Sequence, residues 1–244
     1  MSDHRKNPRA GHGGKKWFCV DIPLIEYQEA WSLQAEIVLA IKDKTIDRNV
    51  VLFLEHPSVF TLGRRGGRNN LNVSEAFLES QGIPLVHVER GGDITYHGPG
   101  QLVAYPVLDL RGAGLDVVGH VTKLEDVMIR TARDFGVKAE RNPLNRGVWV
   151  GNNKLGSIGI AIRRGITFHG FALNVNLTME PFTWIQPCGL QGIGMTSLGR
   201  ELVTDVSMRK ARERARSHME AVFGVALETI GLEELRAKFK SKRS

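Results

Sequence analysis

Apolar residues recur at spacings of three and four along several stretches of the chain, which is the pattern of amphipathic helices. This spacing predicts helices at residues 26–42, 121–135 and 205–223. Gly136 follows the second stretch and supplies a helix stop signal. A short basic helix is expected to close the chain.

Between these stretches lie shorter apolar runs with the alternation or the β-branched content of strands. The predicted strands are residues 50–54, 83–88, 102–110, 148–150, 155–162 and 166–175. Tight-turn residues at 151–153 and 163–165 connect the last three. Few helices separated by runs of strands indicate an α/β (α+β) fold, in which helices pack on a mixed β-sheet.

The composition is that of a globular protein, and the length fits one large domain or one domain with a small appendage. The chain has 244 residues, 42% hydrophobic and 24% charged, which excludes bulk disorder. No apolar run approaches the roughly 20 residues that a membrane span needs. We expect a disordered basic tail at residues 1–16, one domain at 17–224, and a short helical basic extension at 225–244. The polar start predicts no secretory signal, and two cysteines predict no disulfide framework, so we expect a cytoplasmic protein.

The charge is basic, with 33 Lys and Arg against 26 Asp and Glu and a formal net charge of +7. Such a balance is compatible with nucleic acid, a membrane surface or an acidic protein as partner. An arginine-rich helix after Asp205 keeps a non-enzymatic nucleic-acid-binding module as one alternative. The chain shows no known reader motif and no basic stripe interleaved with aromatic residues. We therefore expect neither nucleic acid nor membrane as a partner.

A glycine-rich segment, RGGDITYHGPGQ at residues 90–101, is predicted to form a loop between two strands. Glycine allows the backbone to approach a ligand closely, and such a loop can present N–H groups to an oxyanion or a phosphate. The segment lacks the spacing of a Walker A loop and of a dinucleotide-binding fingerprint. A structural turn is the alternative, but Arg90, Tyr96, His97 and Gln101 favour a functional site.

Cys188 and Lys154 are the other candidates for chemistry. Cys188 lies between Pro187 and Gly189 in a turn-like stretch, where a thiol can face a cleft, although free cysteines are usually buried and inert. Cys19 lies in an apolar stretch and is expected in the core. Lys154 begins a predicted strand after a Gly-Asn-Asn turn, a position that in most proteins is solvated surface.

Together these segments resemble the octanoyltransferases of lipoate biosynthesis, the lipoyl/octanoyl transferase family. The resemblance covers about residues 20–198 and rests on RGGDITYHGPGQ, KLGSIGIAIRRGITFHGFALNVN and WIQPCG, in this order. It implies the catalytic fold that this family shares with biotin and lipoate protein ligases, a mixed β-sheet with packed helices.

The resemblance also implies a two-step acyl transfer. Cys188 matches the family's nucleophile, which takes the octanoyl group from octanoyl-acyl carrier protein as a thioester. Lys154 matches its lysine partner. A lysine on a lipoyl domain of a dehydrogenase complex, or on the H protein of glycine cleavage, would then receive the group as an amide. No metal or other cofactor is implied, and the family is mostly monomeric.

The acyl pocket follows from the same resemblance, with Asp93 at a position that varies. Its expected residues are Arg90, Gly91, Gly92, Asp93, Ile94, Thr95, Tyr96, His97, Ser157, Ile158, Gly159, Gly170, Phe171 and Ala172. Ile158, Ile160, Phe171 and Leu173 are apolar candidates for its walls, with the core as their alternative. Backbone N–H groups near Gly98–Gly100 and at Cys188 are our candidates for stabilising the oxyanion.

The physical chemistry agrees with these roles. A thiol with a pKa of about 8.5 is only about 3% ionised at pH 7, and a nearby ammonium group lowers that pKa. Lys154 can then carry protons to the leaving thiol and from the incoming amine. His97 and His169 are competing candidates for the base. Transfer from thioester to thioester is near balance and transfer to an amide is downhill, so no ATP is needed.

Two related activities remain open. The stretch GRRGGRN at residues 63–69 is similar to the Gly/Arg loop with which biotin ligases hold an acyl-adenylate. An ATP-dependent lipoate or biotin ligase is therefore an alternative, and it would not need Cys188. An amidotransferase that moves octanoyl between two carrier proteins is the other.

Overall fold

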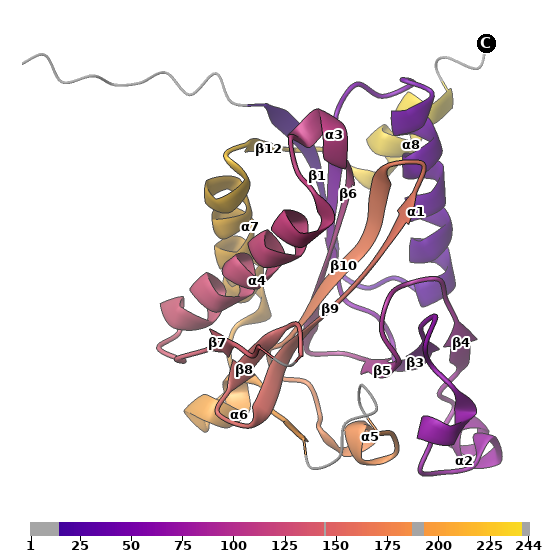
Figure 1. Ribbon diagram of the computed structural model, residues 1–244, viewed down its shortest axis with the longest axis vertical. Helices are drawn as coiled ribbons and strands as arrows, with labels where there is room; N and C mark the ends of the chain where they lie inside the picture. Colours follow the sequence, from indigo (N-terminus) through magenta and orange to yellow (C-terminus); the bar gives the residue numbers. More distant parts are fainter. Residues whose placement is uncertain (1–14, 144, 187–192, 241–244) are drawn as a thin grey trace, which may run out of the picture.

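A mixed β-sheet runs through the centre of the protein, with helices against both of its faces (Figure 1). The computed structural model describes residues 15–143, 145–186 and 193–240. The strands of the main sheet are β1 (Lys16–Ile22), β2 (Val50–Leu54), β6 (Gln101–Asp109), β7 (Glu140–Arg141), β8 (Val148–Val150), β9 (Asn153–Arg163), β10 (Ile166–Asn174), β11 (Gly194–Met195) and β12 (Ala226–Thr229). Across the described part of the chain their order is β12-β1-β2-β6-β10-β9-β8-β7, and β11 pairs with β9.

The strand directions make this sheet mixed, as predicted. β1 pairs in parallel with both β2 and β12, and β11 pairs in parallel with β9. The neighbours from β2 through β6, β10, β9 and β8 to β7 are antiparallel. Every residue of β2 and of β10 is buried, because helices cover the sheet on both faces.

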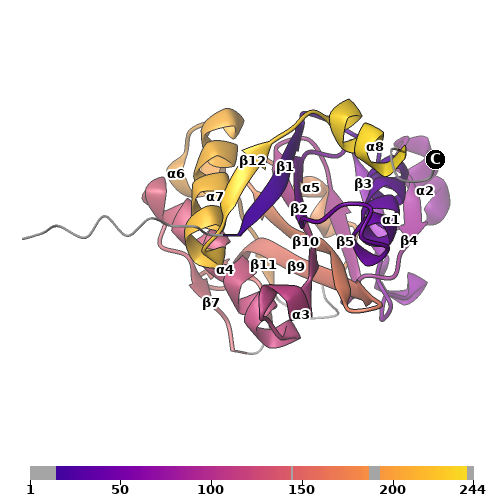
Figure 2. The ribbon, with the colours of Figure 1, turned by 90° about the horizontal axis from the view of Figure 1, so that it is seen from above.

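Helices form the two outer layers, which Figure 2 shows on either side of the sheet. α1 (Tyr27–Lys42) and α8 (Leu232–Lys240) pack together on one face, and α4 (Val117–Asp134) and α7 (Met208–Phe223) pack together on the other. The shorter helices are α2 (Glu75–Ser80), α3 (Leu110–Ala113), α5 (Glu180–Thr183), α6 (Leu198–Leu202) and the 3-10 helix η1 (Arg68–Asn70). Within the described ranges, no helix has both the length and the apolar content to span a bilayer.

A small second sheet lies beside the main one, in the order β4-β3-β5. Its strands are β3 (Val59–Leu62), β4 (Leu85–His87) and β5 (Ile94–His97). β5 corrects our prediction that residues 90–101 form a continuous loop: residues 94–97 are a strand because they pair with β3. The glycine-rich parts of the segment lie before and after this strand.

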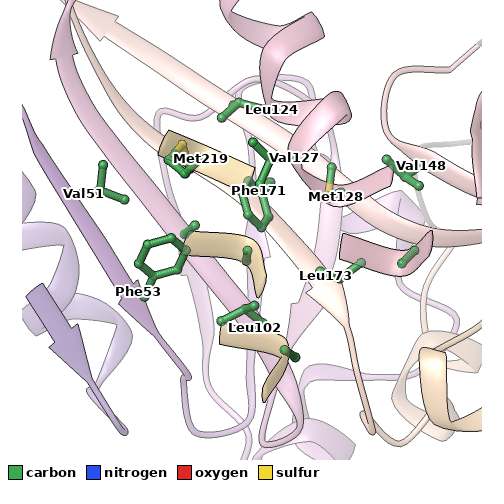
Figure 3. Close-up of a cluster of buried hydrophobic side chains, with 14 of the residues drawn as sticks. Val51, Phe53, Leu102, Leu124, Val127, Met128, Val148, Phe171, Leu173 and Met219 are labelled. Atoms are coloured by element: carbon green, nitrogen blue, oxygen red, sulfur yellow. The ribbon is translucent and has the colours of Figure 1, made fainter. Parts of the chain in front are cut away.

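The main core lies between the sheet and helices α4 and α7. Phe53 of β2, Leu102 of β6 and Phe171 of β10 pack there against Met128 of α4 and Met219 of α7 (Figure 3). Cys19 also lies in this core, as predicted, and burial raises the pKa of its thiol to about 12. A second core fills the space between the sheet and α1.

The ends of the chain differ from the prediction. Lys16, which we expected in a disordered tail, is the first residue of β1 and pairs with Ala226. Where we expected a helical extension after residue 224, β12 first adds a strand to the main sheet. The predicted closing helix follows as α8, and its Leu235 is fully buried. The C-terminal segment therefore packs into the sheet and the α1 layer.

Candidate active site

A cavity lies between α1, the loop at residues 90–93, and strands β9 and β10. All of the predicted pocket residues except Tyr96 line this cavity, and so does Lys154. Tyr27, Tyr105 and His169 complete the lining. The structure therefore brings together three segments that are far apart in the sequence.

Tyr96 faces the other way. Its hydroxyl lies 2.8 Å from the hydroxyl of Ser58, and its ring packs on Phe60 and Phe182 in the core of the small sheet. Side chains alternate between the two faces of a strand, so Tyr96 points away from the face that Thr95 and His97 present to the cavity, while Ile94 at the start of the strand also contributes to the lining. We assign Tyr96 to the support of the cavity wall.

The loop at residues 90–93 is fixed to both sheets. The guanidinium of Arg90 is buried and donates to the carbonyl oxygen of Thr61 in β3 at 2.7 Å. The N–H of Gly91 donates to the carbonyl of Ile160 in β9 at 2.8 Å. Gly159 permits this close approach, because a Cβ there would lie 2.9 Å from Cδ of Arg90. The loop therefore forms a rigid wall.

Lys154 is buried near the start of β9. Its Nζ donates to Oδ1 of Asn145 at 2.6 Å and lies 5.2 Å from the centre of the Trp149 ring. Gly147 passes so close that a Cβ there would lie 2.8 Å from Cε of Lys154. The amine is thus held in one place by an amide oxygen and an aromatic ring. Asn145 gave no signal in the sequence, because it belongs to an irregular loop.

Cys188 lies outside the described residues, but the chain on both sides of it is anchored beside the cavity. Before it, the N–H of Gln186 donates to the carbonyl of Asn70 at 2.8 Å. The side-chain amide of Asn70 donates in turn to Asp93 of the cavity wall at 2.6 Å. After it, Met195 of β11 pairs directly with Lys154.

A buried polar chain links the cavity to this second anchor. Nδ1 of His97 donates to Oε1 of Gln101 at 2.7 Å, and the amide of Gln101 donates to Oδ1 of Asn174 at 2.9 Å. The amide of Asn174 donates to the carbonyl of Thr196 at 2.9 Å. The N–H of Thr196 donates to the carbonyl of Lys154 at 3.0 Å. These bonds fix β11 relative to the cavity.

Histidine and tyrosine side chains crowd the cavity where it approaches α1. Nδ1 of His56 donates to the carbonyl of Ile25 at 2.8 Å, so Nε2 accepts from the hydroxyl of Tyr105, also at 2.8 Å. Burial lowers the pKa of His56 to about 4 and that of His169 to about 3. Burial also holds the pKa of His97 well below its usual range. All three imidazoles are therefore neutral at pH 7.

The structure corrects two further predictions. The N–H of Gly100 donates to Glu55 at 2.9 Å, so it is not free to act as the oxyanion donor predicted there, while the donor predicted at Gly98 stays a prediction. Of the predicted apolar walls, Ile158 and Phe171 line the cavity, whereas Leu173 is fully buried in the main core. Ile160 packs against that core and lines a neighbouring groove instead.

That groove continues outward from the cavity and is basic. It shares Lys154, Gly159 and the loop at residues 91–93 with the cavity, and it adds Arg64, Arg65 and Arg146. Arg146 pairs with Glu125 at 3.2 Å. Arg64 and Arg65 are exposed and form no ion pair with any residue in the described ranges.

Comparison with known proteins agrees with this geometry. Residues 26–220 match a family model described as the lipoyl protein ligase A/B catalytic domain. An octanoyltransferase of Desulfotalea psychrophila is 48% identical over 209 residues, which are 85% of this chain and 94% of that protein. An octanoyltransferase of Caldicellulosiruptor bescii is 44% identical over 213 residues, 86% of this chain and 93% of that protein.

Solved structures show the same fold at low sequence identity. A bipartite lipoate protein ligase from Thermoplasma acidophilum has a TM-score of 0.71 at 16% identity, with 93% of each chain covered. A lipoate-protein ligase A bound with ATP has a TM-score of 0.68 at 17% identity, with 94% of this chain and 95% of that chain covered. The expected ligase-like catalytic fold is therefore confirmed.

Proposed function

Since this chain belongs to the lipoyl protein ligase A/B catalytic-domain family and is an acyltransferase that serves protein lipoylation by octanoyl transfer, we propose a specific route for the octanoyl group. Octanoyl-acyl carrier protein is the donor, Cys188 carries the group as a thioester, and a lysine of a lipoyl domain or of the glycine cleavage H protein accepts it. Lys154 moves the protons.

The observation that carries this proposal is the position of Lys154. Its side chain lines both the acyl cavity and the basic groove, and its strand pairs with β11. Cys188 follows the anchored Gln186 by two residues, and two extended residues span at most about 7 Å. The anchors before and after Cys188 lie beside the cavity and support its pairing with this amine.

In the first step the Cys188 thiolate attacks the thioester carbonyl of the donor. A new C–S bond forms, the old C–S bond breaks, and the departing carrier thiolate takes a proton from the Lys154 ammonium. In the second step the acceptor amine attacks the enzyme thioester. A C–N bond forms, the Cys188 thiolate leaves, and neutral Lys154 accepts the proton from nitrogen. Together the two steps return Cys188 and Lys154 to their starting protonation states, and neither step uses ATP.

The basic groove supports a carrier-bound donor. Arg64 and Arg65 are exposed beside the cavity mouth, and the chain as a whole has a net charge of +7. Acyl carrier proteins and lipoyl domains are generally acidic, so their charge complements this surface and speeds encounter. Raising the salt concentration should therefore lower the second-order rate constant more than the rate of the bound step.

A reconstituted transfer reaction tests the function. The full-length protein is mixed with octanoyl-acyl carrier protein and a lipoyl domain, without ATP, and the mass of the domain is followed. We expect one octanoyl group per domain, and none with the Cys188→Ser variant. Transfer that requires ATP and free acid and survives Cys188→Ser would instead identify the ATP-dependent ligase. Transfer only from an octanoylated carrier domain in amide linkage would identify the amidotransferase.

Cytoplasmic location and a monomeric state stay predictions of the sequence.

A further inference from the structure

Two side chains in the acyl cavity carry polar atoms that no described residue satisfies. These atoms are the hydroxyl of Tyr27 and both ring nitrogens of His169. Tyr27 is 4% exposed and His169 is 1% exposed, and both line the cavity. An unpaired buried polar group is costly, so a site that keeps three such atoms together indicates a ligand or water that pairs with them.

The backbone at His169 is specially arranged. Its φ of 57° is left-handed, which is uncommon for a residue other than glycine, and such strain gathers at functional positions. The pairing of β10 with β6 is interrupted between Thr167 and Phe171. The N–H of His169 donates to Oε1 of Gln34 on α1, at 2.6 Å, instead of to β6. His169 thus makes no backbone hydrogen bond to β6, and the side chain of Gln34 holds its N–H instead.

The register of the sheet places these atoms relative to the reaction centre. His169 pairs with Ile160, which follows Lys154 by six residues along β9. Lys154 and His169 therefore lie at opposite ends of the strand residues that line the cavity. The predicted pocket residues Ser157–Gly159 and Gly170–Ala172 lie between the two. An octanoyl chain whose thioester lies beside Lys154 extends along this middle part toward His169, and each added methylene brings the end of the chain closer to His169.

The ring of Tyr27 lies at the same end of the cavity as His169. The two rings are stacked, with centroids 6.4 Å apart and planes inclined by 17°. The Tyr105 ring meets the His169 ring edge-on at 5.9 Å, but its hydroxyl is already bonded to His56. Two tyrosines therefore face the same region, and only one of them has an unpaired hydroxyl.

We propose that Tyr27 and His169 form a polar floor that limits the length of the acyl chain, an inference that rests on the function proposed above. Water that shares the cavity with an octanoyl chain pairs with the polar floor. A longer alkyl chain displaces that water and offers no hydrogen bond in its place, so its transfer is slower. A long chain with a terminal hydroxyl group replaces the water and is accepted.

Chain-length competition with a matched pair of variants tests the polar floor. The values of kcat/KM are measured for octanoyl, decanoyl and 10-hydroxydecanoyl thioesters of acyl carrier protein. In Tyr27→Phe, the ratio of decanoyl to octanoyl should rise about tenfold, since the hydroxyl that a longer chain would strand is gone. In Tyr105→Phe, the ratio should stay near the wild-type value, because the hydroxyl removed there is one already paired within the protein.

The unmodified protein gives a second test that needs no variant. It should transfer 10-hydroxydecanoyl faster than decanoyl, and Tyr27→Phe should reduce this preference. An unchanged ratio in Tyr27→Phe, an equal rise in both variants, or a wild-type preference for plain decanoyl would overturn the polar floor. If the wild type transfers no octanoyl group at all, the proposed function fails instead, so the two failures can be told apart.

Discussion

His120 does not line the cavity, and it should make the stability of the fold sensitive to acid. It lies in the first turns of α4, fully buried, with its ring centroid 5.9 Å from that of Phe223 in α7. No residue in the described ranges bonds to either ring nitrogen. Burial lowers the pKa of this imidazole from 6.5 to about 4.

The size of the effect follows from proton linkage. The unfolded chain takes up a proton at His120 below pH 6.5, whereas the folded chain does so only near pH 4. The contribution of neutral His120 to the free energy of unfolding is therefore fully present above pH 6.5 and is lost as the pH falls toward 4. Between pH 7.5 and pH 5, this one group should lower the free energy of unfolding by about 2 kcal/mol.

Urea denaturation of the wild type and of His120→Leu at pH 7.5, 6 and 5 measures this effect. The loss of unfolding free energy between pH 7.5 and 5 should be about 2 kcal/mol smaller in the variant. At pH 7.5 the variant should be at least as stable, because leucine removes two unpaired buried nitrogens. His87→Gln, at an exposed position, is the control and should keep the wild-type dependence. Identical pH dependence in His120→Leu and wild type would refute this reasoning.

Three further experiments with substituted proteins test the site. Lys154→Met should slow formation of the acyl-enzyme by about 10²–10⁴-fold in stopped-flow assays, while circular dichroism shows an unchanged fold; a normal rate would remove the lysine from the mechanism. Gly159→Ala should destabilise the protein by about 1–3 kcal/mol and slow octanoyl transfer, because its Cβ would lie 2.9 Å from the cavity wall. Gly67→Ala, where the nearest atom is 3.9 Å away, should do neither, and equal effects would contradict the close approach. Replacing Arg64 and Arg65 by glutamate should lower kcat/KM about tenfold more for octanoyl-acyl carrier protein than for octanoyl-pantetheine. Equal losses for the two donors would exclude the groove as the binding site of the carrier protein.

The sequence predicted several buried strands because burial dictates their apolar pattern. Residues 50–54 and 148–150 are strands at the predicted bounds, since the first is an apolar run between polar residues and the second is an apolar run between glycines. The strands β1, β3, β5, β7, β11 and β12 were missed. All of them except β1 have four residues or fewer, and such short strands depend on the partner that pairs with them. Helix α4 begins four residues earlier than predicted, where the side chain of Asp116 accepts from the N–H of Gly119 at 2.6 Å.

Only part of the cavity lining could be predicted from the sequence. Residues 90–95 stand out by a glycine-rich pattern that is contiguous in the sequence, whereas residues 157–159 and 170–172 were expected only from the family resemblance. Tyr27 occupies an apolar position on a helix, and Tyr105 lies within an apolar strand, so both read as core. Their place beside His169 depends on how α1, β6 and β10 meet, which no local pattern encodes.

The most direct test of the mechanism is the mass of the intact enzyme after it meets octanoyl-acyl carrier protein without an acceptor. The account predicts a gain of one octanoyl group, located on Cys188 by peptide mapping and released by hydroxylamine. Subsequent addition of a lipoyl domain should return the enzyme to its original mass as the domain gains the group. An unmodified enzyme that still octanoylates the domain, or a wild-type gain in mass in Cys188→Ser, would contradict it.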